Sequence, residues 1–163
     1  ALDDFCEVNI SILGNNPYEV SVTEEPKSNG KVLSFADKYE GQKEAKGMAG
    51  SKRLIPAKQK PEVIEEIEKG AVKFFRAIGG KGIARVDFMV SNAGKVYFNE
   101  INTMPGSLAF YLWEASGVPF EKLVSRLVRL ALEEKTETDA LIKTFGSSIL
   151  EGLAVNGLKG GKV

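Results

Sequence analysis

The clearest pattern in the chain is a pair of short alternating segments between residues 83 and 101, separated by turn-forming residues. In residues 83–90 apolar and polar side chains alternate, as expected of a strand with one buried face. Ser91-Asn92-Ala93-Gly94 is typical of a turn, and residues 95–101 form a second run. The pattern predicts a β-hairpin that leads into a Pro-Gly loop.

The alternation assigns each side chain of this hairpin to a face. The first strand has its apolar residues on one face, namely Ala84, Val86, Phe88 and Val90, and Arg85 and Asp87 on the other. The second strand has Val96, Phe98 and Glu100 on one side and Tyr97, Asn99 and Ile101 on the other. A four-residue loop, Asn92 to Lys95, places Asp87 opposite Glu100 and Arg85 opposite Asn102. A one-residue bulge at Gly94 turns Glu100 to the other face, so a functional interpretation requires the even register.

Two carboxylates, an amide and a guanidinium would then share one face of the hairpin. Like charges directly opposite each other destabilise a sheet, so Asp87 opposite Glu100 favours a cation between them. Oxygen ligands of this kind suit Mg²⁺ or Mn²⁺, often with phosphate oxygens in the same shell. Arg85 would face a phosphate or a developing oxyanion. The alternative, which the alternation alone favours, is an exposed hairpin with solvated charges.

Three further strands are predicted upstream of the hairpin. Residues 6–13 alternate and end at Gly14-Asn15-Asn16-Pro17, residues 19–22 form a second strand, and 23–30 read as a turn into residues 31–35. The following segment, to about residue 57, has many charges and little periodicity, and predicts a long mobile loop. Lys38, Lys43, Lys46, Lys52 and Arg53 in this region could each neutralise a phosphate, although an exposed loop lysine is the ordinary alternative for Lys38.

Three helices are predicted around these strands. Pro61 begins the first, which has an apolar face of Ile64, Ile67, Ala71, Phe74, Phe75 and Ile78 and ends at Gly79-Gly80. Residues 109–116 form a short helix, and Pro119 begins a third that runs to about Lys135 with a core face of Phe120, Leu123, Val124, Leu127, Val128 and Ala131. Strands in a mostly antiparallel meander backed by helices predict an α+β fold.

Composition narrows the function classes. The 163 residues contain 22 Lys and Arg and 22 Asp and Glu, which argues against a nucleic-acid or anionic-membrane partner. Neither a membrane span nor a signal peptide is expected, so we expect a cytoplasmic location. Because Cys6 is the only thiol and there is no histidine, intrachain disulfides, Cys/His zinc sites and Ser-His catalysis are excluded.

Several segments together resemble one enzyme family. RVDFMV and FNEINTMPGS, with EVNISILGN, FADKY, RLIPA and LWEASG, are similar to the D-alanine–D-alanine ligases of the ATP-grasp superfamily. The resemblance implies an ATP-grasp C-terminal subdomain and the ATP-dependent joining of two D-alanines through an acyl phosphate. It also implies that residues 1–163 are the C-terminal portion of a longer enzyme, with 146–163 a Gly-rich tail.

The resemblance assigns roles to individual positions. It implies that Asp87, Glu100 and Asn102 bind two Mg²⁺ or Mn²⁺ ions and that Arg85 and Gly106 stabilise the oxyanion. It also implies that Glu7 and Lys38 contact ATP. The substrates would be contacted by Tyr39, Ser107 and Leu108. The partners implied are ATP and D-alanine, and a homodimer of the complete enzyme is the expected assembly.

The segment after Gly106 departs from the family pattern. Only five residues separate it from Leu112, fewer than in the better-known ligases, so another acceptor such as a D-hydroxy acid remains an alternative. Ser107 would bind the acceptor carboxylate, or merely cap the following helix. A second alternative is that this chain alone is a non-catalytic fragment that binds metal or nucleotide.

Overall fold

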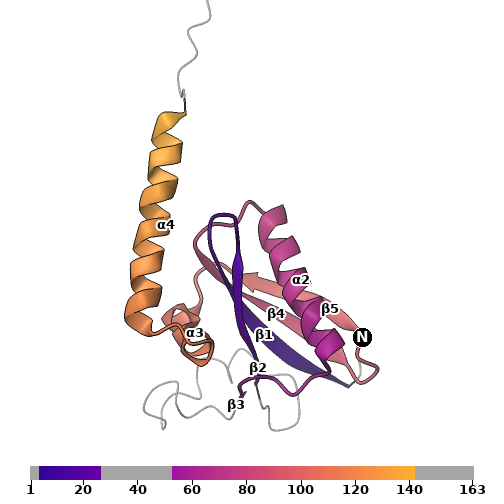
Figure 1. Ribbon diagram of the computed structural model, residues 1–163. Coiled ribbons are helices and arrows are strands. Elements are labelled where there is room, and N and C mark those ends of the chain that lie inside the picture. The colour runs from indigo at the N-terminus through magenta and orange to yellow at the C-terminus, as the bar shows by residue number, and fades with distance from the viewer. Residues whose placement is uncertain (1–3, 27–52, 142–163) are drawn as a thin grey trace, which may run out of the picture.

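The computed structural model describes residues 4–26 and 53–141, in which five antiparallel strands form one sheet (Figure 1). The strands are β1 (Phe5–Leu13), β2 (Glu19–Pro26), β3 (Arg53–Leu54), β4 (Ile83–Ser91) and β5 (Val96–Asn102), in the order β3-β2-β1-β4-β5. The predicted turn over 23–30 is wrong at its start, because β2 continues to Pro26. The strand predicted at 31–35 and most of the predicted loop lie outside the described residues.

The described residues also form four helical segments. They are α2 (Pro61–Ala77), the 3₁₀ turn η3 (Gly106–Ala109), α3 (Phe110–Ala115) and α4 (Phe120–Ala140). In Figure 1 α2 lies across one face of the sheet, whereas α3 and α4 lie on the other side of β2. The expectation of an α+β fold is confirmed. None of the helices in the described ranges has both the length and the apolar character needed to cross a membrane.

The apolar face of the sheet packs against α2. Val8, Ile10 and Ile12 of β1 are fully buried, and together with β4 and α2 they form the main core, whose α2 members are Val63, Ile67, Ala71 and Phe75. The predicted face of α2 is partly wrong, because the buried row advances in steps of four from Val63. Ile64 and Phe74 are half-buried, and Ile78 is 56% exposed at the end of the helix.

The hairpin has the predicted residue pairing across its polar face, but its register near the turn differs from the prediction by one residue. Asp87 pairs with Glu100 and Arg85 with Asn102, as the sequence predicts. Near the turn, however, Val90 pairs with Val96, and a bulge between Phe98 and Glu100 restores the register. The predicted faces of Val96 and Phe98 are therefore wrong, because both share the α2 face with their partners on β4. Ile101 lies on the α2 face, as the predicted alternation implies, whereas Tyr97 pairs with Met89 on the opposite face.

A second apolar cluster attaches α3 and α4 to the sheet. Leu13, Ile83, Trp113 and Leu123 are its buried members. The indole Nε1 of Trp113 donates to Ser11 Oγ at 2.9 Å, and Ser11 Oγ donates to the Ala84 carbonyl at 3.0 Å. These bonds satisfy polar groups that burial would otherwise leave unpaired, so they fix α3 over β1 and β4.

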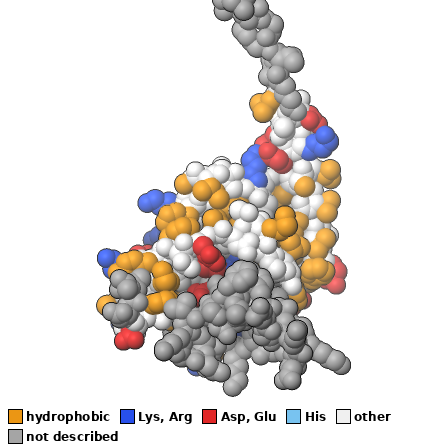
Figure 2. Space-filling view, turned by 180° about the vertical axis from the view of Figure 1, so that it is seen from behind, with side chains coloured by type: hydrophobic (Ala, Val, Ile, Leu, Met, Phe, Trp, Pro, Cys, Tyr) orange, Lys and Arg blue, Asp and Glu red, His pale blue; other side chains and the backbone are white. Residues whose placement is uncertain are grey.

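Only the first turns of α4 are part of this cluster. Leu123 is its one buried residue within the described range, while Val128 and Leu132 are 55% and 61% exposed. Figure 2 shows hydrophobic side chains along the helix where it projects from the body. The predicted core face therefore holds for Leu123 and, in part, Leu127, but not for Val128.

Two isoleucines on α2 test this account of the core. Ile67→Ala removes a side chain with 0% exposure and should lower the free energy of unfolding by about 2–5 kcal/mol. The matched control Ile78→Ala, at 56% exposure, should change it by about 0.5 kcal/mol or less. Equal losses in urea denaturation would contradict the assigned α2 face.

Candidate functional site

The face of the sheet turned away from α2 carries a continuous row of polar residues. Glu24 on β2, Asn9 on β1, Asp87 on β4 and Glu100 on β5 are successive cross-strand partners. Since directly paired residues point to the same side of a sheet, their side chains form one line across four strands. This row brings three carboxylates together from segments far apart in the sequence.

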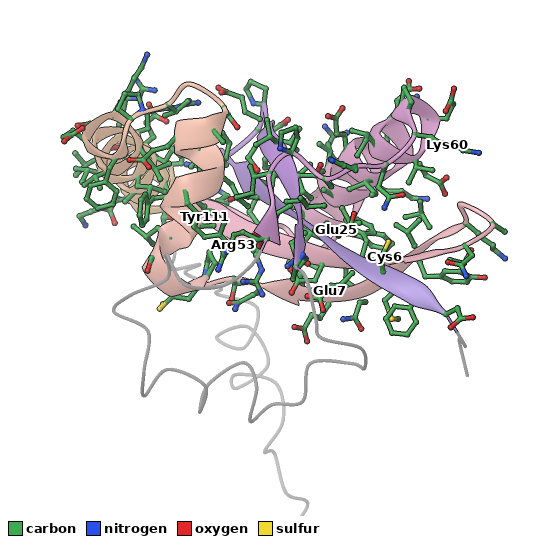
Figure 3. All side chains as sticks on the ribbon, turned by 90° about the horizontal axis from the view of Figure 1, so that it is seen from below. Cys6, Glu7, Glu25, Arg53, Lys60 and Tyr111 are labelled. Carbon is green, nitrogen blue, oxygen red and sulfur yellow. The ribbon has the colours of Figure 1, made fainter. Side chains whose placement is uncertain are left out.

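A second row runs beside the first. It consists of Ser11, Arg85 and Asn102, again as successive partners on β1, β4 and β5. Glu7 lies on the other side of the first row, paired with Met89 and facing away from α2. Figure 3, viewed from below, shows Glu7 on this side of the sheet. The sheet therefore gathers Arg85, Asp87, Glu100 and Asn102 on one surface, as predicted, and Glu7 lies on the same surface.

An ion pair on this face joins Arg85 to Asp87. The guanidinium donates twice, from Nε to Oδ1 at 2.7 Å and from Nη2 to Oδ2 at 2.8 Å. The Asp87 side chain has 0% exposure and that of Arg85 has 21%. Burial lowers the pKa of Arg85, but the hydrogen bonds and charge of Asp87 outweigh it and raise the pKa above its ordinary value. Arg85 is therefore a fixed cation.

Glu24 ends the row in a cluster at the β2–β3 edge. Its Oε1 accepts a hydrogen bond from the Tyr111 hydroxyl at 2.7 Å, and its Oε2 lies 3.1 Å from Arg53 Nη1. The Arg53 guanidinium stacks 4.5 Å from the centre of the Tyr111 ring. In Figure 3 Arg53 and Tyr111 lie side by side. Burial, and then the Glu24 charge, raise the pKa of the Tyr111 phenol, so Tyr111 remains a hydrogen-bond donor.

The loop after β5 holds an unusual backbone. Ser107, Leu108 and Ala109 have φ values of 52°, 55° and 49°, in the left-handed region that non-glycine residues rarely adopt. Such strain costs of order 1–3 kcal/mol per residue and clusters at ligand-binding segments. A Cβ added at Gly106 would meet no atom of the described residues within 4 Å, so none of them covers this side of its backbone.

The same loop speaks against the capping role that Ser107 was given as an alternative. The N-cap residue of α3 is Ala109, without a side-chain cap bond, so Ser107 does not occupy the capping position. Ser107 is exposed, whereas Leu108 packs partly against the Trp113 cluster. Lys38 and Tyr39 lie outside the described residues, so their predicted contacts stay predictions.

The polar face offers oxygen donors for a divalent metal. Among the described residues no three His, Cys, Asp or Glu side chains form a metal cluster, so a cation here relies on two carboxylates, an amide and ligand oxygens. Each Asp87 oxygen takes one hydrogen bond from Arg85 and keeps a second lone pair. Asn102 Oδ1 accepts from the Met104 N–H at 3.0 Å and likewise keeps one. The residues therefore fit Mg²⁺ or Mn²⁺ with phosphate oxygens completing the shell.

Sequence reasoning missed Asn9, Glu24 and Tyr111 as members of this surface. Asn9 carries a detectable signal, since it alternates with Val8 and Ile10 and lies two residues from Glu7. Glu24 falls in the segment predicted as a turn, and nothing local indicates that Tyr111 reaches β2. Both depend on long-range packing.

An antiparallel sheet backed by a helix, with carboxylates on its other face and a strained loop after β5, agrees with the ATP-grasp fold that the resemblance implies. Comparisons with known proteins define the family further. The model of the D-Ala–D-Ala ligase C-terminus matches residues 2–129, and the chain belongs to this family.

Similar proteins include complete ligases from several bacteria. The D-alanine–D-alanine ligase of Geobacillus thermodenitrificans is 38% identical over 144 residues, covering 85% of this chain and 37% of that protein. Among solved structures, the D-alanine–D-alanine ligase from Coxiella burnetii gives a TM-score of 0.67 at 26% identity, covering 85% of this chain and 35% of its own. The VanG D-Ala:D-Ser ligase from Enterococcus faecalis gives 0.63 at 25% identity, covering 80% and 37%. The chain thus spans little more than a third of these relatives.

The Arg85–Asp87 pair can be tested by a double-mutant cycle. Arg85→Ala or Asp87→Ala alone should destabilise the chain by about 3–5 kcal/mol, because each leaves a partly or fully buried charge unpaired. The double variant should cost about 1–3 kcal/mol less than the sum of the two. The exposed pair Glu65–Lys69, at 2.5 Å, is the control and should show no measurable coupling in the same denaturation assay. Additive effects at Arg85 and Asp87 would contradict the ion pair.

Proposed function

We propose that this chain is the C-terminal part of an ATP- and Mg²⁺-dependent ligase that joins two D-alanines. The observation that carries the proposal is the pairing of Asp87 with Glu100 beside Arg85 on a face that also holds Glu7. Two opposed carboxylates need a cation, and a fixed guanidinium next to them suits a transferred phosphate. Family membership and the similarity to ligases of known structure support the same conclusion.

In this proposal each group has a defined task. Glu7 accepts hydrogen bonds from the ATP ribose, Lys38 contacts phosphate, and Asp87, Glu100 and Asn102 hold the metal. A bound Mg²⁺ neutralises phosphate charge during phosphoryl transfer. Arg85 and the Gly106 N–H donate to the oxygen that becomes negative when the acceptor amine attacks. The side of the Gly106 backbone that no described residue covers supports the last role.

The proposed reaction has two steps. The carboxylate of the first D-alanine attacks the γ-phosphorus of ATP, which forms an acyl phosphate and releases ADP. The amine of the second D-alanine then attacks the acyl carbon, loses a proton and expels phosphate. The dipeptide would serve cell-wall synthesis in the cytoplasm, and a homodimer is the proposed assembly.

The acceptor is the least constrained part of the proposal. The shortened loop after Gly106, with its three left-handed residues, gives the acceptor side of the site a distinct shape. The chain's similarity to a protein named as a D-Ala:D-Ser ligase supports D-serine as a second candidate acceptor. The shortened loop is the only feature that favours a D-hydroxy acid. Phosphate release by the full-length protein with D-alanine, D-serine and D-lactate in turn distinguishes these acceptors. The 163-residue chain alone should release none.

Glu100→Gln tests the metal assignment. It keeps the shape of the side chain but removes the charge opposite Asp87, so D-alanine-dependent phosphate release by the full-length protein should fall about a hundredfold or more. The exposed Glu121→Gln on α4 is the control and should leave turnover unchanged. Near-normal turnover of Glu100→Gln with an unchanged Mg²⁺ requirement would exclude Glu100 as a ligand.

Ser107→Ala tests acceptor recognition. A hydroxyl that donates to a carboxylate contributes about 1.5–3 kcal/mol, so its loss should raise the acceptor KM about tenfold or more. The KM for ATP should not change, because the loop lies at the end of β5 and not beside Glu7. An unchanged acceptor KM would remove Ser107 from the site.

A further inference from the structure

Asn9 lies among the carboxylates on the polar face of the sheet. It is 3% exposed, and its cross-strand partners are Glu24 on one side and Asp87 on the other. Glu7 precedes it by two residues on the same face of β1. Its side-chain amide therefore lies between the proposed ribose ligand and a proposed metal ligand.

The amide has two orientations with different partners. In one, Nδ2 donates to Glu24 Oε1 at 3.3 Å, and Oδ1 faces the carboxylates of Glu7 and Asp87, acceptor against acceptor. Rotated by 180°, Nδ2 donates to Glu7 Oε1 and to Asp87 Oδ1, each at 3.2 Å. The second orientation replaces two repulsive contacts by two charge-assisted hydrogen bonds, and leaves one acceptor contact with Glu24.

Glu24 does not need the amide, because Tyr111 and Arg53 already donate to its two oxygens. The second orientation is therefore the more favourable one. Asp87 is then held from two directions, by Arg85 at 2.7 and 2.8 Å and by Asn9 at 3.2 Å. With Asp87 buried, these donors occupy both lone pairs of Oδ1 and one of Oδ2, so they fix where the remaining lone pair of Oδ2 points.

An uncharged donor has a specific consequence at this position. A lysine or arginine would satisfy Glu7 and Asp87 but would also cancel the negative charge that attracts a divalent cation. The asparagine amide supplies two N–H groups and no charge. It therefore orients both carboxylates while leaving their charge available to a cation and to a nucleotide's hydroxyl groups.

We propose that Asn9 is a positioning residue that couples the nucleotide-binding carboxylate Glu7 to the metal-binding carboxylate Asp87. This inference rests on the proposed function. Because one amide holds both carboxylates, a nucleotide that fixes Glu7 also fixes Asp87 for the cation. By thermodynamic reciprocity, the cation strengthens nucleotide binding by the same factor.

The test measures coupling by binding, without turnover. In the full-length protein, the Mn²⁺ dissociation constant is measured by electron paramagnetic resonance with and without the ATP analogue AMP-PNP. The ratio of the two constants is the coupling factor. Asn9→Ala should lower this factor about tenfold. Asn9→Ser, which keeps one donor, should give an intermediate value and serves as the second variant if Asn9→Ala fails to fold.

Ser11→Ala is the matched control on the same strand and face. It removes the partner of Trp113 and should lower the melting temperature, yet it should leave the coupling factor unchanged. An Asn9→Ala protein whose coupling factor stays within about twofold of the unsubstituted protein, or a Ser11→Ala protein that loses coupling equally, would overturn the positioning role. Failure of the unsubstituted protein to bind AMP-PNP would instead overturn the proposed function, and this inference with it.

Discussion

A carboxylate with no exposed surface must be paired, and in this chain that requirement is met where Asp87 meets Arg85. Burying a single charge costs several kcal/mol, and two charge-assisted hydrogen bonds from one guanidinium offset that cost. The pair occupies adjacent rows of the polar face, so the strands on both sides must present polar partners there. Ser11, Asn9, Glu100 and Asn102 are those partners.

The two faces of the sheet have different roles: one forms the core, and the other carries the candidate site. The α2 face is an apolar core that holds the strands in register, and this register alone brings residues 7, 24, 87 and 100 together. On the other face, Trp113 and Tyr111 attach α3 through hydrogen bonds to Ser11 and Glu24. The strained loop that precedes α3 is thereby held at the end of the polar rows. Stability and the proposed chemistry therefore depend on the same strand pairing.

Local patterns predicted much of this arrangement. Alternation placed Arg85 and Asp87 on one face. The predicted pairing with Glu100 and Asn102 holds only because a bulge offsets a one-residue difference in register near the turn. The bulge between Phe98 and Glu100 had no local signal, because it follows from how the side chains of β5 pack on α2. The cluster of Glu24, Arg53 and Tyr111 joins three segments separated by up to 87 residues. A contact between residues so far apart in the sequence cannot be predicted from local periodicity. Asn9 was missed because an asparagine between apolar residues looks like one more solvent-facing position.

The central claim is that Asp87 and Glu100 form one cation site served by Glu7 and Arg85. The most direct measurement is a crystal structure of the full-length protein with Mn²⁺ and AMP-PNP, in which anomalous scattering locates the metal. We expect the Mn²⁺ peak between the Asp87 and Glu100 carboxylates, with metal–oxygen distances near about 2.2 Å and the ribose hydroxyls on Glu7. A Mn²⁺ peak bound by other residues, with Asp87 still held only by Arg85 and Asn9, would contradict the account.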